Sequence, residues 1–479
     1  MLFYAVIYCL FLLFNILVIN NVPDKFKCPF LLLTSLSFYC WLSPCALLVL
    51  IFTIFTGYFY AIEISECPID KNKDKILFRG ILLNLLILVI FRYTGELIDL
   101  INFLSGLNIS YNGETAFSII GVSFFTFQNI SYLIDCYLET FLPEKNILYF
   151  ALYISFFPKI LQGPIERASN LIPQFRKKKI PDYETLRNGL LLLFWGLIKK
   201  LLIADNLSVM VNNVFGNYTE STSFILILAI YCYCMQIYFD FSGYTDIARG
   251  SAKMLGIDLT DNFNNPYLAV SIQDFWKRWH ISLSSWILDY LFKPLQMRCR
   301  EYGNYGLTFS LLVTFFICGM WHGLRLNYIL WGVYHGILIS LSFLTNKKCL
   351  KFYKKYHINA SLSYFIDVII TFHLICFSWL IFRVNNLYEL YYISNKIFHD
   401  VFNLNIINTI GAGNNLGTSR IIYLLTLIII FIEFISVKLN LKSLFDRQNI
   451  IIRWICYYSA LFLIFKYYRQ NMQFIYFQF

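Results

Sequence analysis

The chain has 479 residues, of which 58% are hydrophobic and only 14% are charged. Because soluble proteins carry charge on about a quarter of their residues, this composition excludes a soluble domain with a single anchor and predicts a polytopic membrane protein. The formal net charge is +11. Cytoplasmic loops that follow the positive-inside rule explain this excess better than nucleic-acid binding does. We therefore expect the lipid bilayer, and no nucleic acid, as a partner.

Apolar segments recur along the chain, and its length accommodates about eleven to thirteen membrane-crossing helices. Residues 1–20 have no preceding positive charge and no small-residue cleavage site, so they predict a first membrane segment rather than a removed signal. Residues 28–65 predict two short spans with a turn at Ser43-Pro44, and residues 80–93 predict another span. Further helices are expected at 187–215 and 223–239, and a last span at 451–467.

The charges of the loops predict the topology. The basic loops 71–79, 176–179 and 347–355 are expected in the cytoplasm, whereas loops 105–116 and 402–419 contain no Lys or Arg and are expected outside. The run at 176–179 is either a solvated loop or a contact for acidic lipid or coenzyme phosphates. We expect a multi-pass protein of the cytoplasmic (inner) membrane.

Polar residues interrupt three of the apolar stretches. Gln128 and Asp135 are seven residues apart, which places both on one helical face, either as tolerated polar groups in an ordinary span or as the lining of a cavity. Residues 156–167 contain two Pro and one Gly, which a straight helix does not accommodate. Broken backbone at membrane depth requires surrounding protein or water.

The third interruption is the sequence Tyr-Phe-Asp-Phe-Ser-Gly-Tyr-Thr-Asp at 238–246. Asp240 and Tyr244 are four residues apart, as are Ser242 and Asp246. Two carboxylates in an apolar context are costly without partners. The motif is therefore either a buried polar clamp between helices or a direct contact for substrate.

Residues 264–323 place two His and four Trp, together with Asp, Lys and Arg, between strongly apolar segments. Ionisable groups at membrane depth usually face an interior cavity. Pro266 and Ser271 predict a chain break and a helix N-cap after Asn264. Within that helix, i,i+4 spacing pairs Asp274 with Arg278, and it places Trp276 beside His280.

These motifs carry a family resemblance. Phe-Trp-Lys-Arg-Trp-His-Ile-Ser-Leu-Ser-Ser-Trp at 275–286, followed by Gly-Met-Trp-His-Gly at 319–323, resembles the membrane-bound O-acyltransferases. The likeness is strongest to their bacterial branch of alginate O-acetylation, peptidoglycan O-acetylation and teichoic acid D-alanyl transfer. It is specific over 121–336. Many relatives have Pro-Leu-Gly-Gly-Asn-Arg where this chain has Pro-Leu-Gln-Met-Arg-Cys-Arg at 294–300, so the role of that loop is open.

The resemblance implies a single domain over 1–479, in which a ring of helices, some re-entrant or horizontal, surrounds a thin funnel-shaped core. It implies that His322 is the catalytic residue. His280 would orient the acceptor, hold the carbonyl oxygen or assist proton movement. His335 is expected to give structural support rather than to act as a second base. The predicted channel-lining residues are Gln128, Asp135, Asp240, Ser242, Tyr244, Asp246, Asn264, Asp274, Trp276, Arg278 and Trp321.

Acyl transfer to a hydroxyl needs a base, and histidine is the natural base near neutral pH. We expect no metal and no bound cofactor. The expected donor substrate is acetyl-CoA or another cytoplasmic acyl thioester. The acceptor is expected to be an extracytoplasmic polysaccharide or a periplasmic acetyltransferase- or esterase-like partner. Three alternatives stay open: D-alanyl transfer from a carrier protein to teichoic acid, a non-catalytic acyl or lipid transporter, and an assembly scaffold.

Overall fold

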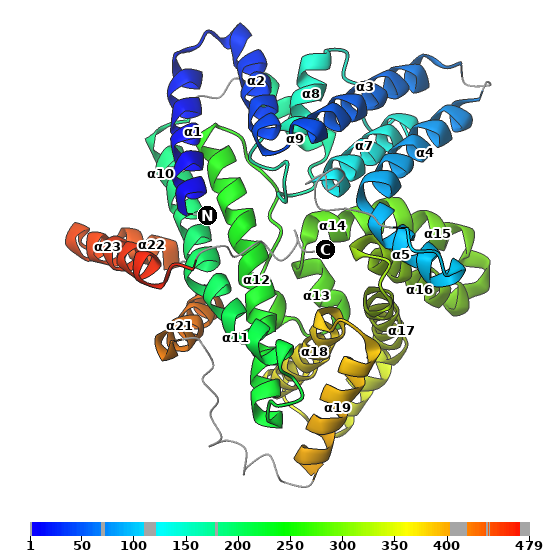
Figure 1. Cartoon of the computed structure of the whole chain (residues 1–479), viewed down its shortest axis with the longest axis vertical. Helices are drawn as coiled ribbons and strands as arrows, with labels where there is room; N and C mark the ends of the chain where they lie inside the picture. The colour runs from blue at the N-terminus through cyan, green and yellow to red at the C-terminus, as the bar shows by residue number, and fades with distance from the viewer. Residues whose placement is uncertain are drawn as a thin grey trace. The chain divides into compact units, whose positions relative to one another are not determined.

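The computed structural model of the chain describes residues 2–68, 72–109, 121–177, 181–402, 419–436, 439 and 441–469. Its regular elements in these ranges are helices (Figure 1). The β-type pairing found there is one isolated bridge between Phe263 and Trp279. The all-α prediction is confirmed. The described chain divides into two compact units, one of Met1–Trp195 with Tyr244–Asp261 and one of Gly196–Gly243 with Asn262–Phe479.

The N-terminal helices of the first unit cover the expected spans, but the helix expected at 80–93 begins at Lys73, and the helix Thr94–Ser105 was not predicted. They are α1 (Leu2–Asn21), α2 (Asp24–Leu42), α3 (Pro44–Glu66), α4 (Lys73–Arg92) and α5 (Thr94–Ser105). The turn between α2 and α3 is confirmed, because Ser43 accepts a hydrogen bond from the Ala46 amide and Pro44 occupies the first helical position. Proline is suited to that position, where the missing N–H has no helical partner to lose.

Farther along the first unit, the expected break in the helices is present. Helices α7 (Val122–Tyr137) and α8 (Ile147–Ser155) precede it, and α9 (Ala168–Arg176) and α10 (Tyr183–Leu197) follow it. Residues 156–167 are not helical. Lys159, within this break, is only 2% exposed, and its ammonium donates to Gln128 Oε1 at 2.8 Å. The irregular backbone is thus enclosed by protein.

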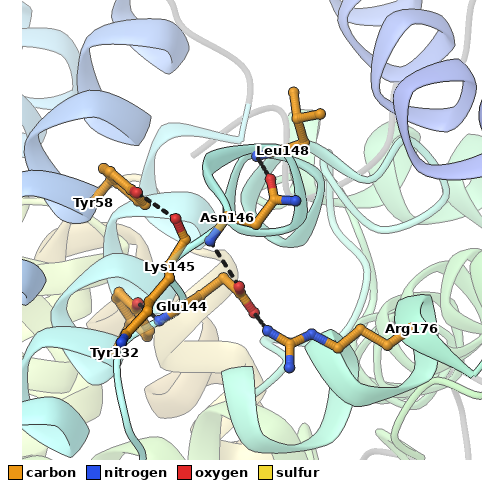
Figure 2. A network of polar contacts seen from close by, with 7 residues as sticks. All are labelled: Tyr58, Tyr132, Glu144, Lys145, Asn146, Leu148 and Arg176. Carbon is orange, nitrogen blue, oxygen red and sulfur yellow. Dashed lines mark hydrogen bonds and ion pairs between the residues drawn. The ribbon is translucent and has the colours of Figure 1, made fainter. Parts of the chain in front are cut away.

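A polar network holds the loop between α7 and α8 (Figure 2). The buried Glu144 carboxylate accepts from the Asn146 amide at 2.9 Å and pairs with the Arg176 guanidinium, while the Glu144 amide donates to the Tyr132 hydroxyl at 2.8 Å. Arg176 is the first residue of the basic run at 176–179, so this member of the run has a partner within the protein. Residues 178 and 179 lie outside the described ranges.

The second unit contains the π-helical turn η1 (Ile198–Ala204) and α11 (Asp205–Gly216), and it holds most of the later helices. Those that bear on the site are α13 (Ile272–Arg278), α14 (Ile281–Ile287), α15 (Lys293–Arg298), α16 (Gly303–His322), α17 (Leu326–Lys355) and α18 (Ala360–Arg383). The remaining described helices are α19 (Leu387–Phe402), α21 (Arg420–Ser436), α22 (Leu441–Asp446) and α23 (Ile450–Tyr467). The last span is confirmed at α23.

Helix α12 (Ser223–Met254) corrects the prediction of a helix that ends at residue 239, because it continues through the 238–246 motif without a break. Gly243 allows this by its small size. A Cβ atom at Gly243 would lie 2.8 Å from the Gly196 carbonyl oxygen and 3.0 Å from Lys199 Cβ. The glycine is therefore needed for close backbone approach to the π-helical turn and its flanks rather than for a change of direction.

A second close approach joins α16 to α17. A Cβ atom at Gly319 would meet the Tyr328 carbonyl oxygen at 2.4 Å, and one at Gly332 would meet the Phe315 carbonyl oxygen at 2.2 Å. The two glycines also face each other, since a Cβ at Gly332 would lie 3.1 Å from Gly319 Cα. Small residues that let helix backbones touch are typical of membrane-helix packing.

Within the described residues, six helices are long and apolar enough to cross a membrane. They are Pro44–Glu66, Ser223–Met254, Arg300–His322, Leu326–Thr345, Ala360–Arg383 and Ile450–Tyr467. The chain is thus a multi-pass membrane protein. Residues 73–79 and 347–355 were expected in loops but are helical, as the start of α4 and the end of α17. The count of eleven to thirteen helices, the single domain over 1–479 and the sidedness of the connecting segments stay predictions. Most of loops 105–116 and 402–419 lies outside the described ranges.

Candidate functional site

The site begins at α13, whose start follows the sequence signals. Residues Pro266–Leu268 form a single 3-10 turn, and the Ser271 hydroxyl then accepts from the Asp274 amide at 3.1 Å as the N-cap. The predicted i,i+4 pair is present, with Arg278 Nε donating to Asp274 Oδ1 at 2.9 Å. Both side chains are partly exposed, so this ion pair stabilises the helix only modestly and places no buried charge in the site.

The expected contact between Trp276 and His280 is wrong. Helix α13 ends at Arg278, Trp279 is extended, and His280 enters the left-handed region at φ 44° and ψ 54°. The two residues therefore no longer share a helical face. Trp276 Nε1 instead donates to His335 Nδ1 at 3.3 Å, while the His280 ring meets Phe241 of α12 edge-on at a centroid distance of 4.6 Å.

His322 is the last residue of α16, where the helix ends, and it is buried among aromatic rings. Its ring lies 4.7 Å from Trp321, 5.1 Å from Trp331 and 5.2 Å from Phe382, measured between centroids, and it meets the last two edge-on. Trp331 belongs to α17 and Phe382 to α18. Three helices of the second unit thus fix the orientation of this imidazole.

The two predicted catalytic histidines are close enough to influence each other electrostatically. Burial lowers the pKa of His280 from 6.5 to about 3, and the neighbouring His322 adds to the shift. His280 lies outside the candidate spans and is only 1% exposed. A neutral His280 can therefore donate or accept a hydrogen bond at pH 7 but does not carry a fixed charge.

His335, by contrast, is held in one tautomer. An indole N–H only donates, so Nδ1 of His335 must accept from Trp276 and the ring proton must sit on Nε2. Neither nitrogen of this tautomer is then available as a base. The ring is fully buried and lies against Trp331 at 4.8 Å. This arrangement favours the structural role expected for His335.

The 238–246 motif supplies a buried charge cluster to the second unit. The Lys200 ammonium pairs with Asp240 and with Asp205, the latter at 2.9 Å, and all three side chains are almost wholly buried. Lys200 and Asp205 come from η1 and α11, so Asp240 joins neighbouring helices. Ser242, two residues after Asp240 in the chain, is also buried. These contacts favour the clamp over direct substrate contact for Asp240.

The other predicted channel residues divide between the two units. Trp321, Trp276 and His280 belong to the second unit with His322, and so does Asn264, which is exposed and bonds Arg278 through its backbone amide at 2.9 Å. Four residues belong to the first unit: Gln128, Asp135, Tyr244 and Asp246. Gln128 binds Lys159, as described above, and Asp246 lies 3.7 Å from Arg249.

The most useful residue that the sequence did not single out is Asn262. It is 1% exposed and bonds the start of α14, directly after His280. The aromatic neighbours Phe241, Trp331 and Phe382 were also missed as parts of the site. Asn262 carried a weak sequence signal, because it follows the charged Asp261 and comes just before the turn residues Asn264 and Pro266. Phe241 lies within the 238–246 motif, but nothing in a chain with 48 Phe and 9 Trp marked these aromatic residues as neighbours of the two histidines.

Comparison with known proteins places this site in a family. The model of the membrane-bound O-acyltransferase family matches residues 140–390. The probable alginate O-acetylase AlgI of Pseudomonas aeruginosa is 30% identical, over 88% of this chain and 79% of that protein. The peptidoglycan O-acetyltransferase of Helicobacter pylori is 33% identical, over 74% of this chain and 71% of its own length. The teichoic acid D-alanyltransferase of Bacillus subtilis is 31% identical, over 55% of this chain and 68% of its own length. The chain therefore belongs to the membrane-bound O-acyltransferase family and is an O-acyltransferase.

Proposed function

We propose that this protein transfers an acetyl group from a cytoplasmic thioester to a hydroxyl of an extracytoplasmic polysaccharide. One observation carries the choice of acetyl. The two O-acetylating relatives match 88% and 74% of this chain, whereas the D-alanyltransferase matches 55%. The family membership itself argues against the transporter and scaffold alternatives.

In the proposed reaction, His322 accepts the proton of the acceptor hydroxyl as its oxygen attacks the thioester carbonyl. The carbon–sulfur bond breaks, and the departing thiolate takes the proton back from His322 to become a thiol, which restores the neutral imidazole. General-base assistance of this kind contributes on the order of 10²–10⁴ in rate. The edge-on contacts of Trp331 and Phe382 support the role by fixing the imidazole plane, since reactivity depends on a near-attack geometry.

His280 is proposed to bind the acceptor hydroxyl or the carbonyl oxygen. A neutral imidazole serves either task, because it has one N–H donor and one acceptor nitrogen, and its low pKa keeps it uncharged near pH 7. The donor is proposed to be acetyl-CoA, which arrives from the cytoplasm. We propose that the helices form a ring around a funnel with His322 at its constriction, so that donor and acceptor meet from opposite sides.

The acceptor polymer is the least constrained part of the proposal. The divergent sequence at 294–300 forms most of α15 and a turn after it, and its side chains are partly or fully exposed. Alginate and peptidoglycan are the polymers acted on by the two O-acetylating relatives named above. A periplasmic esterase-like protein that receives the acetyl group first is a further proposed partner.

Reconstituted protein supplied with radiolabelled acetyl-CoA and glycans from its own cell tests the proposal. Label is expected in the polymer, or in a periplasmic partner added to the reaction, and His322→Ala is expected to abolish its transfer. A parallel reaction contains D-alanyl-carrier thioester as the donor. Consumption of that thioester, with no acetyl label in polymer or partner, would overturn the acetyl assignment in favour of D-alanyl transfer.

A further inference from the structure

The backbone at His280 adopts a conformation that a side-chain-bearing residue rarely takes. Its φ of 44° and ψ of 54° lie in the left-handed region, between the extended Trp279 and the first residue of α14. Such a conformation costs on the order of 1–3 kcal/mol and persists only where surrounding contacts hold it. Some element of the structure must therefore hold His280 in place.

Asn262 makes the contacts that hold it. Its backbone oxygen accepts from the Ile281 amide at 3.0 Å, and its side-chain Oδ1 accepts from the Ser282 amide at 3.1 Å. These amides are the first two of α14, which have no partner inside the helix. His280 occupies the N-cap position but makes no side-chain capping bond. Asn262 thus caps α14 from a distant part of the chain.

Two neighbouring contacts extend this arrangement to both sides of His280. The Asn264 amide donates to the Arg278 carbonyl at 2.9 Å, and Phe263 forms the isolated bridge with Trp279. On the ring side, Phe241 meets the imidazole of His280 edge-on, and Phe241 in turn packs against Phe263 at 5.2 Å. The segment 262–264 therefore runs alongside residues 278–282 and contacts the two residues on each side of His280.

We propose that Asn262 is a positioning residue that fixes the left-handed turn at His280, and so sets where the His280 imidazole lies relative to His322. The kinetic part of this inference rests on the proposed function; the structural part does not. Misplacement of a reacting group by about 1 Å can cost about 100-fold in rate. Loss of Oδ1 is therefore expected to lower kcat by about 10-fold to 100-fold, with little change in the KM for acetyl-CoA.

The test compares two variants of similar size in the full-length protein. Asn262→Leu removes the acceptor oxygen, and Asn262→Asp retains one. Asn213→Ala, an exposed asparagine of α11, controls for the loss of an asparagine elsewhere. Each variant is treated with diethyl pyrocarbonate, and the modification of individual histidines is followed by mass spectrometry. His335, fully buried, is the internal reference for an intact fold, and His399, which is exposed, is the reference for reagent activity.

Asn262→Leu is expected to raise the modification rate of His280 on the order of tenfold, which corresponds to about 1.4 kcal/mol, the net contribution of one or two hydrogen bonds. Asn262→Asp and Asn213→Ala are expected to leave His280 protected, as is the wild type. Protection of His280 in Asn262→Leu equal to that in the wild type would overturn the inference. So would equal exposure of His280 in the Leu and Asp variants.

The labelling measures His280 directly and needs no substrate, which separates this inference from the proposed function. If wild-type protein transfers no acetyl group but Asn262→Leu exposes His280, the positioning role stands and the proposed function fails. If the wild type transfers acetyl groups and His280 stays protected in Asn262→Leu, the proposed function stands and the positioning role fails. If Asn262→Leu also exposes His335, its fold is no longer intact and Asn262→Asp decides. Modification of His280 in Asn262→Asp, with His335 still protected, would contradict the role of the acceptor oxygen.

Discussion

The indole nitrogen of Trp276 donates a hydrogen bond to Nδ1 of His335 at 3.3 Å, between α13 and α17. This bond fixes the tautomer of a fully buried imidazole, and it ties the short helix that precedes His280 to the long helix that carries Trp331. The bond favours a structural role for His335 over a role in proton transfer.

The Trp276–His335 bond predicts a measurable contribution to stability. Trp276→Phe retains most of the ring but leaves the buried Nδ1 of His335 without its donor, which is expected to cost about 1–3 kcal/mol. Thermal unfolding in detergent, followed by intrinsic fluorescence, measures the change. Trp454→Phe, at a half-exposed position in α23, is the control and is expected to unfold near the wild-type temperature. Equal unfolding temperatures for the two variants would show that the bond contributes nothing.

The glycine contact between α16 and α17 predicts a loss of stability of similar size. Gly319→Ala places a methyl group 2.4 Å from the Tyr328 carbonyl oxygen, so the helices must separate, at a cost of about 1–3 kcal/mol. Gly216→Ala is the matched control, because nothing lies within 4 Å of its Cβ position at the end of α11. The same unfolding assay compares them. A Gly319→Ala protein as stable as Gly216→Ala would contradict the close packing of these helices.

The buried cluster around Lys200 predicts non-additive effects. Lys200→Met removes the ammonium shared by Asp205 and Asp240, and breaking a buried ion pair from one side costs about 3–5 kcal/mol. The triple variant Lys200→Met, Asp205→Asn, Asp240→Asn removes the charges together and is expected to be more stable than Lys200→Met alone. Lys293→Met, which breaks an exposed pair with Asp289, is expected to cost no more than about 1 kcal/mol. A triple variant less stable than Lys200→Met would refute the clamp.

The pKa of His280 predicts how stability depends on pH. Burial, with His322 adding to it, lowers this pKa from 6.5 to about 3. Between these values the unfolded chain binds a proton that the folded chain does not, so the free energy of unfolding falls as the pH falls below 6.5. At pH 5 the loss from this group reaches about 2 kcal/mol. Unfolding measured at pH 7.5 and pH 5 should therefore show a smaller difference for His280→Gln than for the wild type. An equal difference would mean that His280 is protonated in the folded state.

Much of the fold could be predicted because local chemistry determines it. Ser43 and Pro44 at the start of α3, the broken segment around Lys159 and the Ser271 cap of α13 each follow from one or two residues. The failures were of another kind. The 238–246 motif was expected to follow a helix, but Gly243 serves close packing inside α12, which only the neighbouring chain at Gly196 reveals. Likewise, an i,i+4 spacing placed Trp276 beside His280, but α13 ends at Arg278 and the contact is lost.

The site was predictable at its two histidines and not in its surroundings. The motifs around His280 and His322 are distinctive, so a resemblance could identify them. Their aromatic neighbours come from α12, α17 and α18, and contacts between distant segments leave no pattern in a chain so rich in Phe, Tyr and Trp. Asn262 was missed for the same reason, since its importance lies in hydrogen bonds to residues about twenty positions away.

The central claim is that His322 carries out acyl transfer, and ester content in the cell tests it most directly. Cells that express wild type, His322→Ala or the exposed-site control His399→Ala are compared at equal protein levels, and O-acetyl ester is measured in purified cell-surface polymer. Loss of a general base costs on the order of 10²–10⁴ in rate, so ester is expected to fall to background in His322→Ala and to stay at the wild-type level in His399→Ala. Near-normal ester in His322→Ala, with equal expression, would contradict the account.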